Sequence, residues 1–527
     1  MSRKPDDARR TLTAVNPATG EALGEVPLAT ADEVRARIEA ANQAFPAWSA
    51  LSVEQRARYL QRARDYMLDR LDEVCATISR ENGKPRVEAL SSEVFLVADL
   101  ITLYAARAPS ILADRSIPLH NPLFKATKSS RLVHQPLGVI SIVTPWNYPF
   151  SIPMSGIVFA LLAGNTVVFK PASGTALVGL KIDEILNQGG GLPPGVLNTV
   201  VAAGSSVGTA LFEPPVRKVV FTGSTEVGRR IHEIAARSFI PTVMELGGKD
   251  PMIVCDDADI DLAAAGAVWG AFTNCGQVCA SVERVYVARS VHDRFVEKVA
   301  ARTRALRVGA DADHEVDVGP LANPEQLATV EAQVVDALSK GARVVAGGRR
   351  PVGPGNFFEP TVLADVNHTM KVMREETFGP LLPIMPFDSE DEAVRLANDS
   401  EYGLTASVWT RDRERGEAIA RRLLAGTVTV NDCVYTYGLC ETPWQGVKDS
   451  GIGRSHSDAG LLEFVFPKHV NVDRSPGFMK RRMWWFPYGR AAYEVQKLAV
   501  RAFVSAKAMP RFLASVIGRK DYRKALM

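Results

Sequence analysis

Short and almost wholly apolar runs recur through the middle of this chain, and helical segments separate them. Four such runs are Gly138–Val143, Asn165–Phe169, Val196–Val201 and Val216–Phe221. Helices are predicted between them, for example over residues 175–187 and 226–237. Strands that are so continuously apolar are typical of a parallel sheet covered by helices on both faces. The chain is therefore predicted to have an α/β fold, in which ligands bind at the carboxyl ends of the strands.

The segments on either side extend this plan. Residues 31–115 are predicted to be mostly helical, with one helix from Ala31 through Phe45 and another from Glu54 to Asn82. Residues 250–450 repeat the alternation of apolar runs and helices, which indicates a second α/β domain. With 527 residues the chain is too long for one simple core, so two or three domains are expected.

Composition and charge exclude several classes of protein. The chain is 46% hydrophobic and 23% charged, and its net charge of +3 predicts no nucleic acid or other acidic partner. Six cysteines in so long a chain do not form a disulfide framework, and no apolar run follows the first charged residues, so we expect a cytoplasmic protein. The eight histidines are scattered and no Cys-x-x-Cys spacing occurs, so no metal site is predicted.

Three residues are candidates for a catalytic site: Cys279, Glu245 and Asn147. A thiol can attack a carbonyl carbon, a carboxylate can activate the water that releases the product, and an amide can hold the oxyanion formed between these steps. Each residue alone also has a plainer interpretation. A single cysteine is usually a small buried hydrophobe, Asn147 could be a turn residue, and Glu245 could be a surface charge.

The motifs around these residues favour the catalytic interpretation. In chain order they are Pro145–Pro149 (PWNYP), Lys170–Ser173 (KPAS), Phe221–Ser224 (FTGS), Glu245–Lys249 (ELGGK), Gly276–Cys279 (GQVC), Glu376–Pro380 (ETFGP) and Ser450–Arg454 (SGIGR). One such motif would be weak support, whereas seven in order make a chance likeness very improbable. By these motifs the chain resembles the aldehyde dehydrogenase superfamily over roughly residues 12–475.

This resemblance implies a Rossmann-type cofactor domain, an α/β catalytic domain and a small oligomerisation element. On this sequence the cofactor domain is expected over residues 1–115 and 137–247, and the catalytic domain over residues 248–450. The oligomerisation element is expected over residues 116–136 and 455–475, and residues 476–527 form a basic amphipathic tail. A homodimer or homotetramer is implied in the same way.

The same resemblance implies a role for each catalytic candidate. Cys279 is expected to form a thiohemiacetal with an aldehyde, so its surroundings should favour the charged thiolate. Asn147 and the backbone N–H of Cys279 would hold the oxyanion. Hydride transfer to the nicotinamide would leave a thioester, and Glu245 would activate the water that hydrolyses it. Ser455 stands where many relatives carry a glutamate that assists proton release, which leaves the proton route open.

The cofactor implied by the resemblance is NAD or NADP. The residues expected to bind it are Thr144, Pro145, Trp146, Lys170, Ser173, Gly204, Gly208, Phe221, Gly223, Ser224, Gln326, Glu376 and Phe378. Gly223 and Ser224 would approach the pyrophosphate at a helix N-terminus. Ser173 replaces a glutamate that, in many relatives, grips the ribose hydroxyls. Because a carboxylate there would repel a 2′-phosphate and a hydroxyl would not, NADP is predicted to be accepted; drift at a tolerant position is the alternative.

The expected walls of the aldehyde tunnel carry no cation. Residues 150–159 contain no Lys or Arg, and residues 433–440 are largely apolar or aromatic, although core packing would also explain them. A carboxylate-bearing semialdehyde would be expected to meet a cation, so we predict a hydrophobic medium- or long-chain aldehyde. The alternatives are succinate semialdehyde or another small aldehyde, a CoA-acylating enzyme, against which Glu245 argues, and a non-catalytic binding or structural protein on the same fold.

Residues 476–527 differ from the rest of the chain, with 12 Lys and Arg against Glu494 and Asp521. Trp484, Trp485 and Phe486 follow three basic residues, and the helix predicted next carries one apolar face made by Val495, Leu498, Ala499, Ala502, Phe503 and Ala506. Such a helix indicates peripheral contact with the inner face of an anionic membrane, although no apolar run reaches the roughly 18 residues of a spanning helix. A helix packed on the body, an oligomer contact and a solvated tail are the alternatives.

Overall fold

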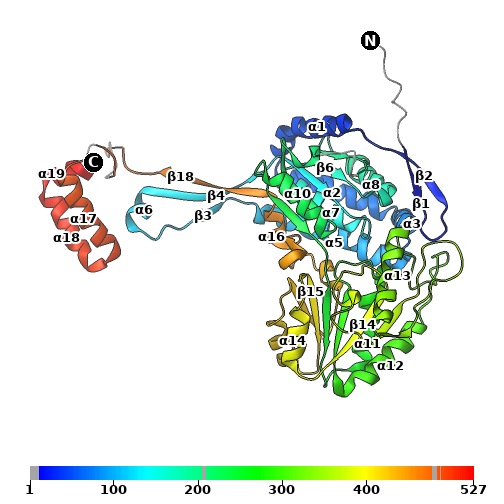
Figure 1. Cartoon of the computed structure of the whole chain (residues 1–527). Coiled ribbons are helices and arrows are strands. Elements are labelled where there is room, and N and C mark those ends of the chain that lie inside the picture. The colour runs from blue at the N-terminus through cyan, green and yellow to red at the C-terminus, as the bar shows by residue number, and fades with distance from the viewer. Residues whose placement is uncertain (1–10, 204–208, 478–483, 487, 527) are drawn as a thin grey trace, which may run out of the picture. The chain divides into compact units, whose positions relative to one another are not determined.

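The computed structural model describes residues 11–203, 209–477, 484–486 and 488–526. The chain divides into two compact units, Met1–Ile111 with Pro136–Val465, and Leu112–Gln135 with Phe466–Met527. The larger unit holds two large sheets with their helices, and the smaller unit holds a three-stranded sheet and a group of helices (Figure 1). The finer four-part division expected from the sequence stays a prediction.

The first large sheet has six strands in the order β17-β9-β8-β5-β6-β7. Their bounds are β5 (Val139–Val143), β6 (Thr166–Lys170), β7 (Leu197–Thr199), β8 (Val216–Thr222), β9 (Thr242–Glu245) and β17 (Gly451–Ile452). Neighbouring strands pair in parallel, except that β17 lies antiparallel to β9 at the edge. The four strands predicted from the apolar runs are present, and β7 is shorter than predicted.

Helices cover both faces of this sheet, because successive side chains of a strand point to opposite sides. On one face, α1 (Ala31–Ser49) and α10 (Thr225–Ala236) share a core with Val139, Val143 and Val219. On the other face, α7 (Ser151–Leu162) packs so closely that a Cβ added at Gly156 would lie 3.4 Å from Ile142. The prediction of a parallel sheet with helices on both faces is confirmed.

The N-terminal helices begin at residues that satisfy their first N–H groups. Thr30 and Ser52 form capping boxes at α1 and at α2 (Val53–Leu68).

The predicted single helix from Glu54 to Asn82 is wrong, because α2 ends at Leu68 and α3 (Leu71–Asn82) starts after a break. Arg70 lies at φ −120° and ψ 29°, outside the helical range. Apolar side chains are buried on both sides of the break, so the spacing of apolar residues in the sequence gave no sign that the helix ends there.

The stretch Arg86–Ile111 comprises α4 (Arg86–Glu88), a π-helical segment over Ala89–Val94 and α5 (Phe95–Ile111). Among the described residues it is the one helical stretch long and apolar enough to cross a membrane, and half of its most apolar window is buried. Within the larger unit, α5 packs against α2 and α7. The core helix of a globular protein has the same length and composition.

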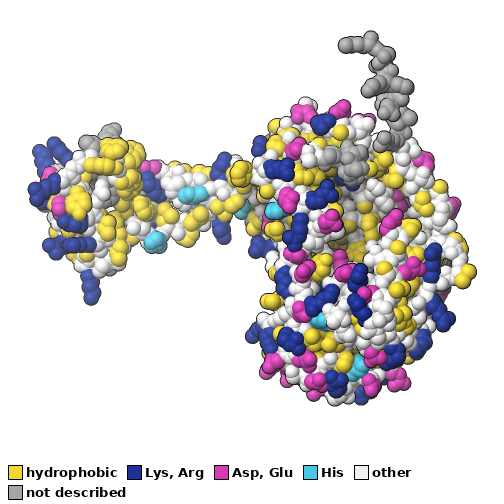
Figure 2. All heavy atoms as spheres, viewed as in Figure 1, with side chains coloured by type: hydrophobic (Ala, Val, Ile, Leu, Met, Phe, Trp, Pro, Cys, Tyr) yellow, Lys and Arg dark blue, Asp and Glu magenta, His cyan; other side chains and the backbone are white. Residues whose placement is uncertain are grey.

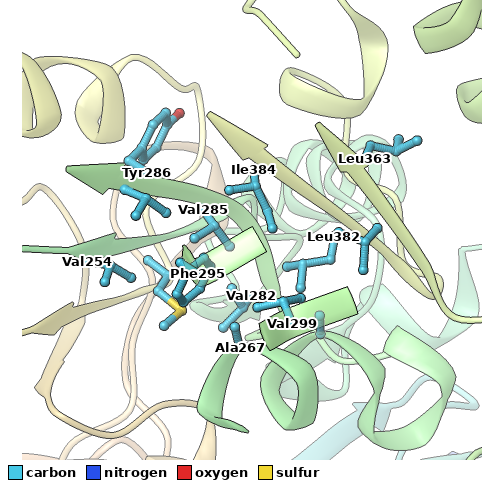
Figure 3. Packing of buried hydrophobic residues seen from close by; sticks show 14 of the residues in the cluster. Val254, Ala267, Val282, Val285, Tyr286, Phe295, Val299, Leu363, Leu382 and Ile384 are labelled. Carbon is cyan, nitrogen blue, oxygen red and sulfur yellow. The ribbon is translucent and has the colours of Figure 1, made fainter. Parts of the chain in front are cut away.

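The second large sheet has seven strands in the order β12-β13-β14-β11-β10-β15-β16. Their bounds are β10 (Asp250–Val254), β11 (Val282–Ala288), β12 (Arg343–Ala346), β13 (Thr361–Ala364), β14 (Leu381–Phe387), β15 (Thr405–Trp409) and β16 (Thr427–Val430). Two helices, α11 (Ile260–Phe272) and α12 (His292–Arg304), pack on each other and on this sheet. Phe295 and Val299 of α12 lie beside Val282 and Val285 of β11 in the core (Figure 3). The second α/β region predicted from the sequence is confirmed.

The smaller unit holds the sheet β18-β4-β3 and three C-terminal helices. Their bounds are β3 (Arg115–Ile117), β4 (Lys128–Pro136), β18 (Val465–Asp473), α17 (Arg490–Val504), α18 (Met509–Gly518) and α19 (Lys520–Leu526). Val495, Ala499 and Ala502 of α17 are buried with Phe512 and Tyr522 of the other two helices. The predicted amphipathic helix is present, but its own neighbours cover the apolar face. The basic residues at 480–482 lie outside the described residues.

Candidate active site

The strand order of the first sheet reverses between β5 and β8. From β5 the chain moves to β6 and β7 on one side, whereas β8 and β9 lie on the other side. A parallel sheet leaves a crevice for ligands at such a switch point, at the carboxyl ends of its strands. Thr144 follows β5, Gly223 follows β8, and Glu245 ends β9. Residues of two predicted motifs, and the residue that directly precedes a third, therefore lie at the same edge of the sheet.

Cys279 lies in the loop between α11 and β11, whose backbone contains three successive left-handed residues. Asn274, Cys275 and Gly276 have φ values of 49°, 56° and 72°. A Cβ at Gly276 would lie 2.3 Å from a neighbouring carbonyl oxygen, so only glycine fits there. The carboxylate of Glu88 accepts hydrogen bonds from the backbone N–H of Asn274 at 3.0 Å. These contacts fix the loop that presents the thiol.

Asn147 is buried and held by hydrogen bonds at both its side chain and its backbone. Its side-chain amide donates to the carbonyl of Gln277 at 3.0 Å. Its own carbonyl accepts from the side chain of Asn274 at 2.9 Å and from the ammonium of Lys84 at 2.8 Å. An amide nitrogen carries two hydrogens, so one remains for a further acceptor. Asn147 lines a cavity together with Cys279, as the predicted oxyanion contact requires.

Lys84 and Glu93 form a buried ion pair at 2.7 Å, with neither side chain exposed. Glu93 also accepts hydrogen bonds from the backbone N–H groups of Phe150 at 2.7 Å and Ser151 at 3.1 Å, at the start of α7. Removing one partner of such a pair costs about 3–5 kcal/mol, because a charge is left buried alone. Neither residue was predicted from the sequence; the one signal was a lysine within the polar run Glu81–Pro85, between two apolar helices.

Glu245 is buried beside Cys279, and both line a small cavity of about 40 Å³ that has room for a water molecule. Its carboxylate accepts hydrogen bonds from the hydroxyl of Ser455, at 3.1 Å, and from the side chain of Trp444. Burial raises the pKa of Glu245 to about 8, and these two hydrogen bonds partly oppose the rise. The other carboxylate oxygen has no hydrogen-bond partner within the described part of the chain.

The surroundings of the Cys279 thiol differ from the prediction. Burial raises the pKa of Cys279 well above that of a free thiol, and the carboxylates of Asp250, Glu245 and Glu376 add to this rise. The expectation that the protein favours the thiolate is therefore wrong for the chain by itself, because the nearby charged groups are acidic. A base must remove the thiol proton, and Glu245 lines the same small cavity.

A larger cavity, of about 280 Å³, also reaches Cys279. The predicted cofactor residues that line it are Pro145, Trp146, Gly223, Ser224, Gln326, Glu376 and Phe378. The rings of Trp146 and Phe378 meet edge to face, with centroids 5.4 Å apart. Gln326 is fixed by a hydrogen bond from its side chain to the carbonyl of Thr377 at 2.8 Å. The fold thus gathers these residues from segments far apart in the sequence.

A buried ion pair holds the segment that carries Glu376 and Phe378. Lys249 and Glu283 pair at 2.6 Å, and the Glu283 carboxylate accepts from the backbone N–H of Phe378 at 2.9 Å. The Glu376 carboxylate accepts from the backbone N–H of Gly248 at 2.9 Å. The motif that begins at Glu245 and the motif that begins at Glu376 therefore support each other directly. Glu283, which holds the second motif in place, belongs to none of the motifs and was not predicted.

The start of α10 fits a phosphate group. Ser224 is the N-cap residue, with φ −67° and ψ 148°, but its hydroxyl makes no capping hydrogen bond. The first N–H groups of α10 therefore lack a side-chain cap beside the cavity that Gly223 and Ser224 line. A helix N-terminus of this kind binds anions. These residues suit the pyrophosphate of a dinucleotide.

Two predicted cofactor residues lie at the carboxyl end of β6, next to β5 in the sheet. Lys170 is the last residue of β6, and burial lowers the pKa of its ammonium group. Ser173 begins the short helical turn Ser173–Thr175 that follows. Neither residue lines the cavity beside Cys279. Their place along the sheet edge is compatible with the predicted contact to the adenosine ribose.

The remaining predicted residues are placed less directly. Thr144 lines the small cavity beside Glu245, and Phe221 is buried in β8. Gly204 and Gly208 lie outside the described residues. Within the described ranges, no group of three or more His, Cys, Asp or Glu side chains is arranged to hold a metal ion.

A third cavity that reaches Cys279, of about 370 Å³, is mainly apolar. Besides Cys279 it is lined by Ser91, Ser92, Phe95, Leu96, Tyr148, Ile152, Trp269, Thr273, Val278, Ala280, Val434, Tyr435, Tyr437, Gly438, Leu439 and Trp444. None of these side chains is charged. Residues 433–440 supply much of one wall, as predicted, and residues 150–159 supply Ile152. The walls from residues 91–96 and from Trp269 were not predicted.

The fold and this site define an enzyme class. The sequence model of the aldehyde dehydrogenase family matches residues 4–470, and the chain belongs to that family. It is an aldehyde dehydrogenase that uses NAD or NADP, as do its relatives. A solved structure of betaine aldehyde dehydrogenase from Staphylococcus aureus in complex with NAD+ has a TM-score of 0.85 at 31% identity, covering 91% of this chain and 94% of that one.

Three relatives are similar over most of their length. The 4,4'-diapolycopene aldehyde oxidase of Methylomonas sp is 40% identical over 484 residues, which cover 92% of this chain and 89% of the relative. The NADP(+) succinate-semialdehyde dehydrogenase GabD of Escherichia coli is 40% identical over 462 residues, 88% and 94% of the two chains. The glutarate-semialdehyde dehydrogenase of Pseudomonas putida is 39% identical over 467 residues, 88% and 95% of the two chains.

Proposed function

We propose that this enzyme oxidises an uncharged aldehyde with an apolar chain to the carboxylic acid, with Cys279 as the nucleophile. The observation that carries this proposal is the cavity of about 370 Å³ that reaches Cys279 and has no charged side chain in its lining. A substrate carboxylate would be buried there without a cation, which is costly. An apolar chain gains about 0.8 kcal/mol for each methylene that it buries.

In the proposed mechanism Glu245 takes the proton of the Cys279 thiol, and the sulfur attacks the carbonyl carbon to form a thiohemiacetal. The second amide hydrogen of Asn147 and the backbone N–H of Cys279 stabilise the oxyanion that forms during this attack. When bound, NAD or NADP supplies the hydride acceptor that allows the adduct to become a thioester.

Hydrolysis of the thioester is assigned to Glu245. Once the proton taken from Cys279 has passed to solvent, the Glu245 carboxylate removes a proton from water, and the water oxygen attacks the thioester carbon. The C–S bond then breaks, the acid is released, and the Cys279 sulfur takes up the proton held by Glu245. A pKa of about 8 suits a base that works near neutral pH. The hydroxyl of Ser455, which donates to this carboxylate at 3.1 Å, is proposed to orient it in place of the glutamate of many relatives.

A small semialdehyde is the second candidate substrate. Two of the three relatives described above are named for succinate or glutarate semialdehyde, so the comparisons favour this alternative over our main proposal. The relative named for diapolycopene aldehyde supports the main proposal. The uncharged lining of the cavity argues against a substrate with a second carboxylate.

Nicotinamide reduction with hexanal, dodecanal and succinic semialdehyde separates these candidates, each with NAD and with NADP, in the presence and absence of CoA. We expect kcat/KM for dodecanal to exceed that for succinic semialdehyde by at least about tenfold, without CoA. The reverse order would replace the apolar substrate by a semialdehyde. A requirement for CoA would indicate an acylating enzyme, and no turnover by the folded protein would favour a binding or structural role.

For the smaller unit we propose peripheral contact with the inner face of an anionic membrane, in a cytoplasmic homodimer or homotetramer. The side chains of Trp484, Phe486 and Tyr488 are exposed, and the helices that follow are rich in Lys and Arg. Cosedimentation with phosphatidylserine vesicles at low salt tests this contact, with phosphatidylcholine vesicles as the control. Equal binding to both, or to neither, contradicts the proposal, and light scattering of the same samples gives the subunit number.

A further inference from the structure

Four large apolar side chains are exposed around the outer end of the apolar cavity. Their exposed fractions are 64% for Phe95, 47% for Trp269, 42% for Tyr435 and 37% for Leu439. All four also line the cavity that reaches Cys279, so they lie where it opens to solvent. We name these four residues the apolar collar. Exposed apolar groups that gather in one place mark binding surfaces more often than isolated ones do.

The collar is assembled from separate parts of the larger unit. Phe95 is the first residue of α5, and Trp269 lies in the last turn of α11. Tyr435 begins the short helical turn Tyr435–Gly438, and Leu439 directly follows it. Three segments far apart in the sequence therefore border one opening. Val278, deeper in the same cavity, is buried, so the apolar surface continues from the collar to the thiol.

The size of the cavity limits what it can enclose. At about 30 Å³ for each water-sized group, 370 Å³ holds on the order of a dozen such groups. A longer aldehyde would fill the cavity and leave the rest of its chain at the opening, where the collar lies. Aromatic side chains such as Phe95 and Trp269 offer large apolar faces for a chain of this kind.

Resting on the proposed apolar substrate, we propose that the collar, at the outer end of the cavity, is a binding site for the distal part of an aliphatic or polyene chain that extends beyond the cavity. The collar would act on the binding of long aldehydes and leave the chemistry at Cys279 unchanged. Short aldehydes occupy only the inner part of the cavity next to Cys279 and would not reach the collar at its outer end. The enzyme would thus prefer substrates longer than the cavity itself can hold.

Serine substitutions in the collar test this site. Trp269→Ser and Phe95→Ser remove collar side chains, and Leu262→Ser is the matched control, because Leu262 is 52% exposed on the same helix as Trp269 and does not line the cavity. The measurement is kcat/KM for hexanal, dodecanal and hexadecanal, each supplied on cyclodextrin. We expect each collar variant to lower kcat/KM for hexadecanal about tenfold, mainly through KM, and to lower kcat/KM for hexanal severalfold less, because hexanal stays in the inner part of the cavity. Leu262→Ser should change neither.

The outcomes separate this site from the proposed function. Wild-type enzyme that oxidises succinic semialdehyde and no apolar aldehyde would overturn the proposed function. Wild-type enzyme that oxidises hexadecanal, with collar variants that lose nothing or lose equally on hexanal, would overturn the collar alone. Trp269→Phe keeps an aromatic ring and should retain most of the hexadecanal activity. Dissociation of an oligomer by Trp269→Ser, measured by light scattering, would make the collar a subunit interface and overturn the proposal.

Discussion

Two cavities meet at Cys279, and they differ in kind. The cavity of about 280 Å³ has a mixed lining, in which polar and charged side chains such as Gln326 and Glu376 stand beside glycines and apolar side chains such as Phe378. The cavity of about 370 Å³ is lined by apolar, aromatic and hydroxyl side chains without charge. The space-filling view shows charged and apolar side chains intermixed over the visible face of the larger unit (Figure 2).

This difference implies two kinds of selectivity. A hydrophobic pocket distinguishes substrates by only about 1–3 kcal/mol for each methylene, so the apolar cavity should tolerate a range of chain lengths. Charge and hydrogen bonding on the cofactor side discriminate more sharply, because an unmatched charge is repelled or left unpaired. Substitutions that affect one cavity and leave the other unchanged would sharpen the comparison, and substitutions at Cys279, which lines both, should affect both.

The largest effect is expected at Cys279, which lines both cavities. Cys279→Ala should lower kcat with every aldehyde and with either cofactor by at least about 10³-fold, because no nucleophile remains. Nicotinamide reduction measures the loss. Cys275→Ala is the matched control, since this buried thiol lies four residues earlier and outside all three cavities. A Cys275 variant as inactive as the Cys279 variant would assign the loss to the loop and not to the thiol.

Glu245→Gln should slow turnover by about 10²–10⁴-fold and leave the acyl group on the enzyme. The amide keeps the shape of the side chain but cannot take a proton from water. Mass spectrometry after incubation with dodecanal and NADP should find the acyl chain on Cys279, and Cys279→Ala should carry none. Because Glu245 is also assigned the deprotonation of the thiol, an equally slow variant without acylated enzyme would show that this earlier step, and not hydrolysis, limits the variant.

Ser173→Glu addresses the cofactor side alone. A carboxylate beside the adenosine ribose should repel a 2′-phosphate, so kcat/KM for NADP should fall on the order of tenfold to a hundredfold while that for NAD holds or rises. Ser173→Gln, of similar size and without charge, is the control. The ratio of hexanal to dodecanal turnover should stay the same. An equal loss with both cofactors would indicate a steric effect and remove the argument from the missing carboxylate.

The two cavities also differ in how far the sequence could predict them. The cofactor side is built from short motifs, in which strand ends and the turns after them stand together in the chain, so Pro145, Gly223 and Phe378 could be named in advance. The apolar side depends on which faces of α5 and α11 the tertiary packing leaves open. Phe95 and Trp269 lie in helices whose sequences are largely apolar, so composition gave no reason to separate them from their buried neighbours.

The polar groups that support the site were harder still to predict. The Lys84–Glu93 and Lys249–Glu283 pairs join residues that only packing brings together, and neither pair has a spacing that indicates its role. The surroundings of Cys279 were predicted wrongly for a related reason. The loop around the thiol suggested an activated group, but Glu245 and Asp250 approach it from other elements and raise its pKa.

The smallest effect is expected for Ser455→Ala, at the cavity of about 40 Å³ behind the thiol. The pKa of Glu245 is raised to about 8 by burial, so hydrolysis should accelerate as pH rises through that value and the carboxylate forms. The Ser455 hydroxyl donates a hydrogen bond that stabilises the Glu245 carboxylate and lowers this pKa. Its removal should therefore move the rising limb of the pH–rate profile to higher pH and slow hydrolysis a few-fold at pH 7. Ester hydrolysis without cofactor, followed from pH 6 to 10, measures the limb apart from hydride transfer, and Ser455→Thr, which keeps the hydroxyl, should leave it in place. A limb that stays fixed in Ser455→Ala would mean that the observed base is not Glu245, or that water replaces the lost hydroxyl in the cavity.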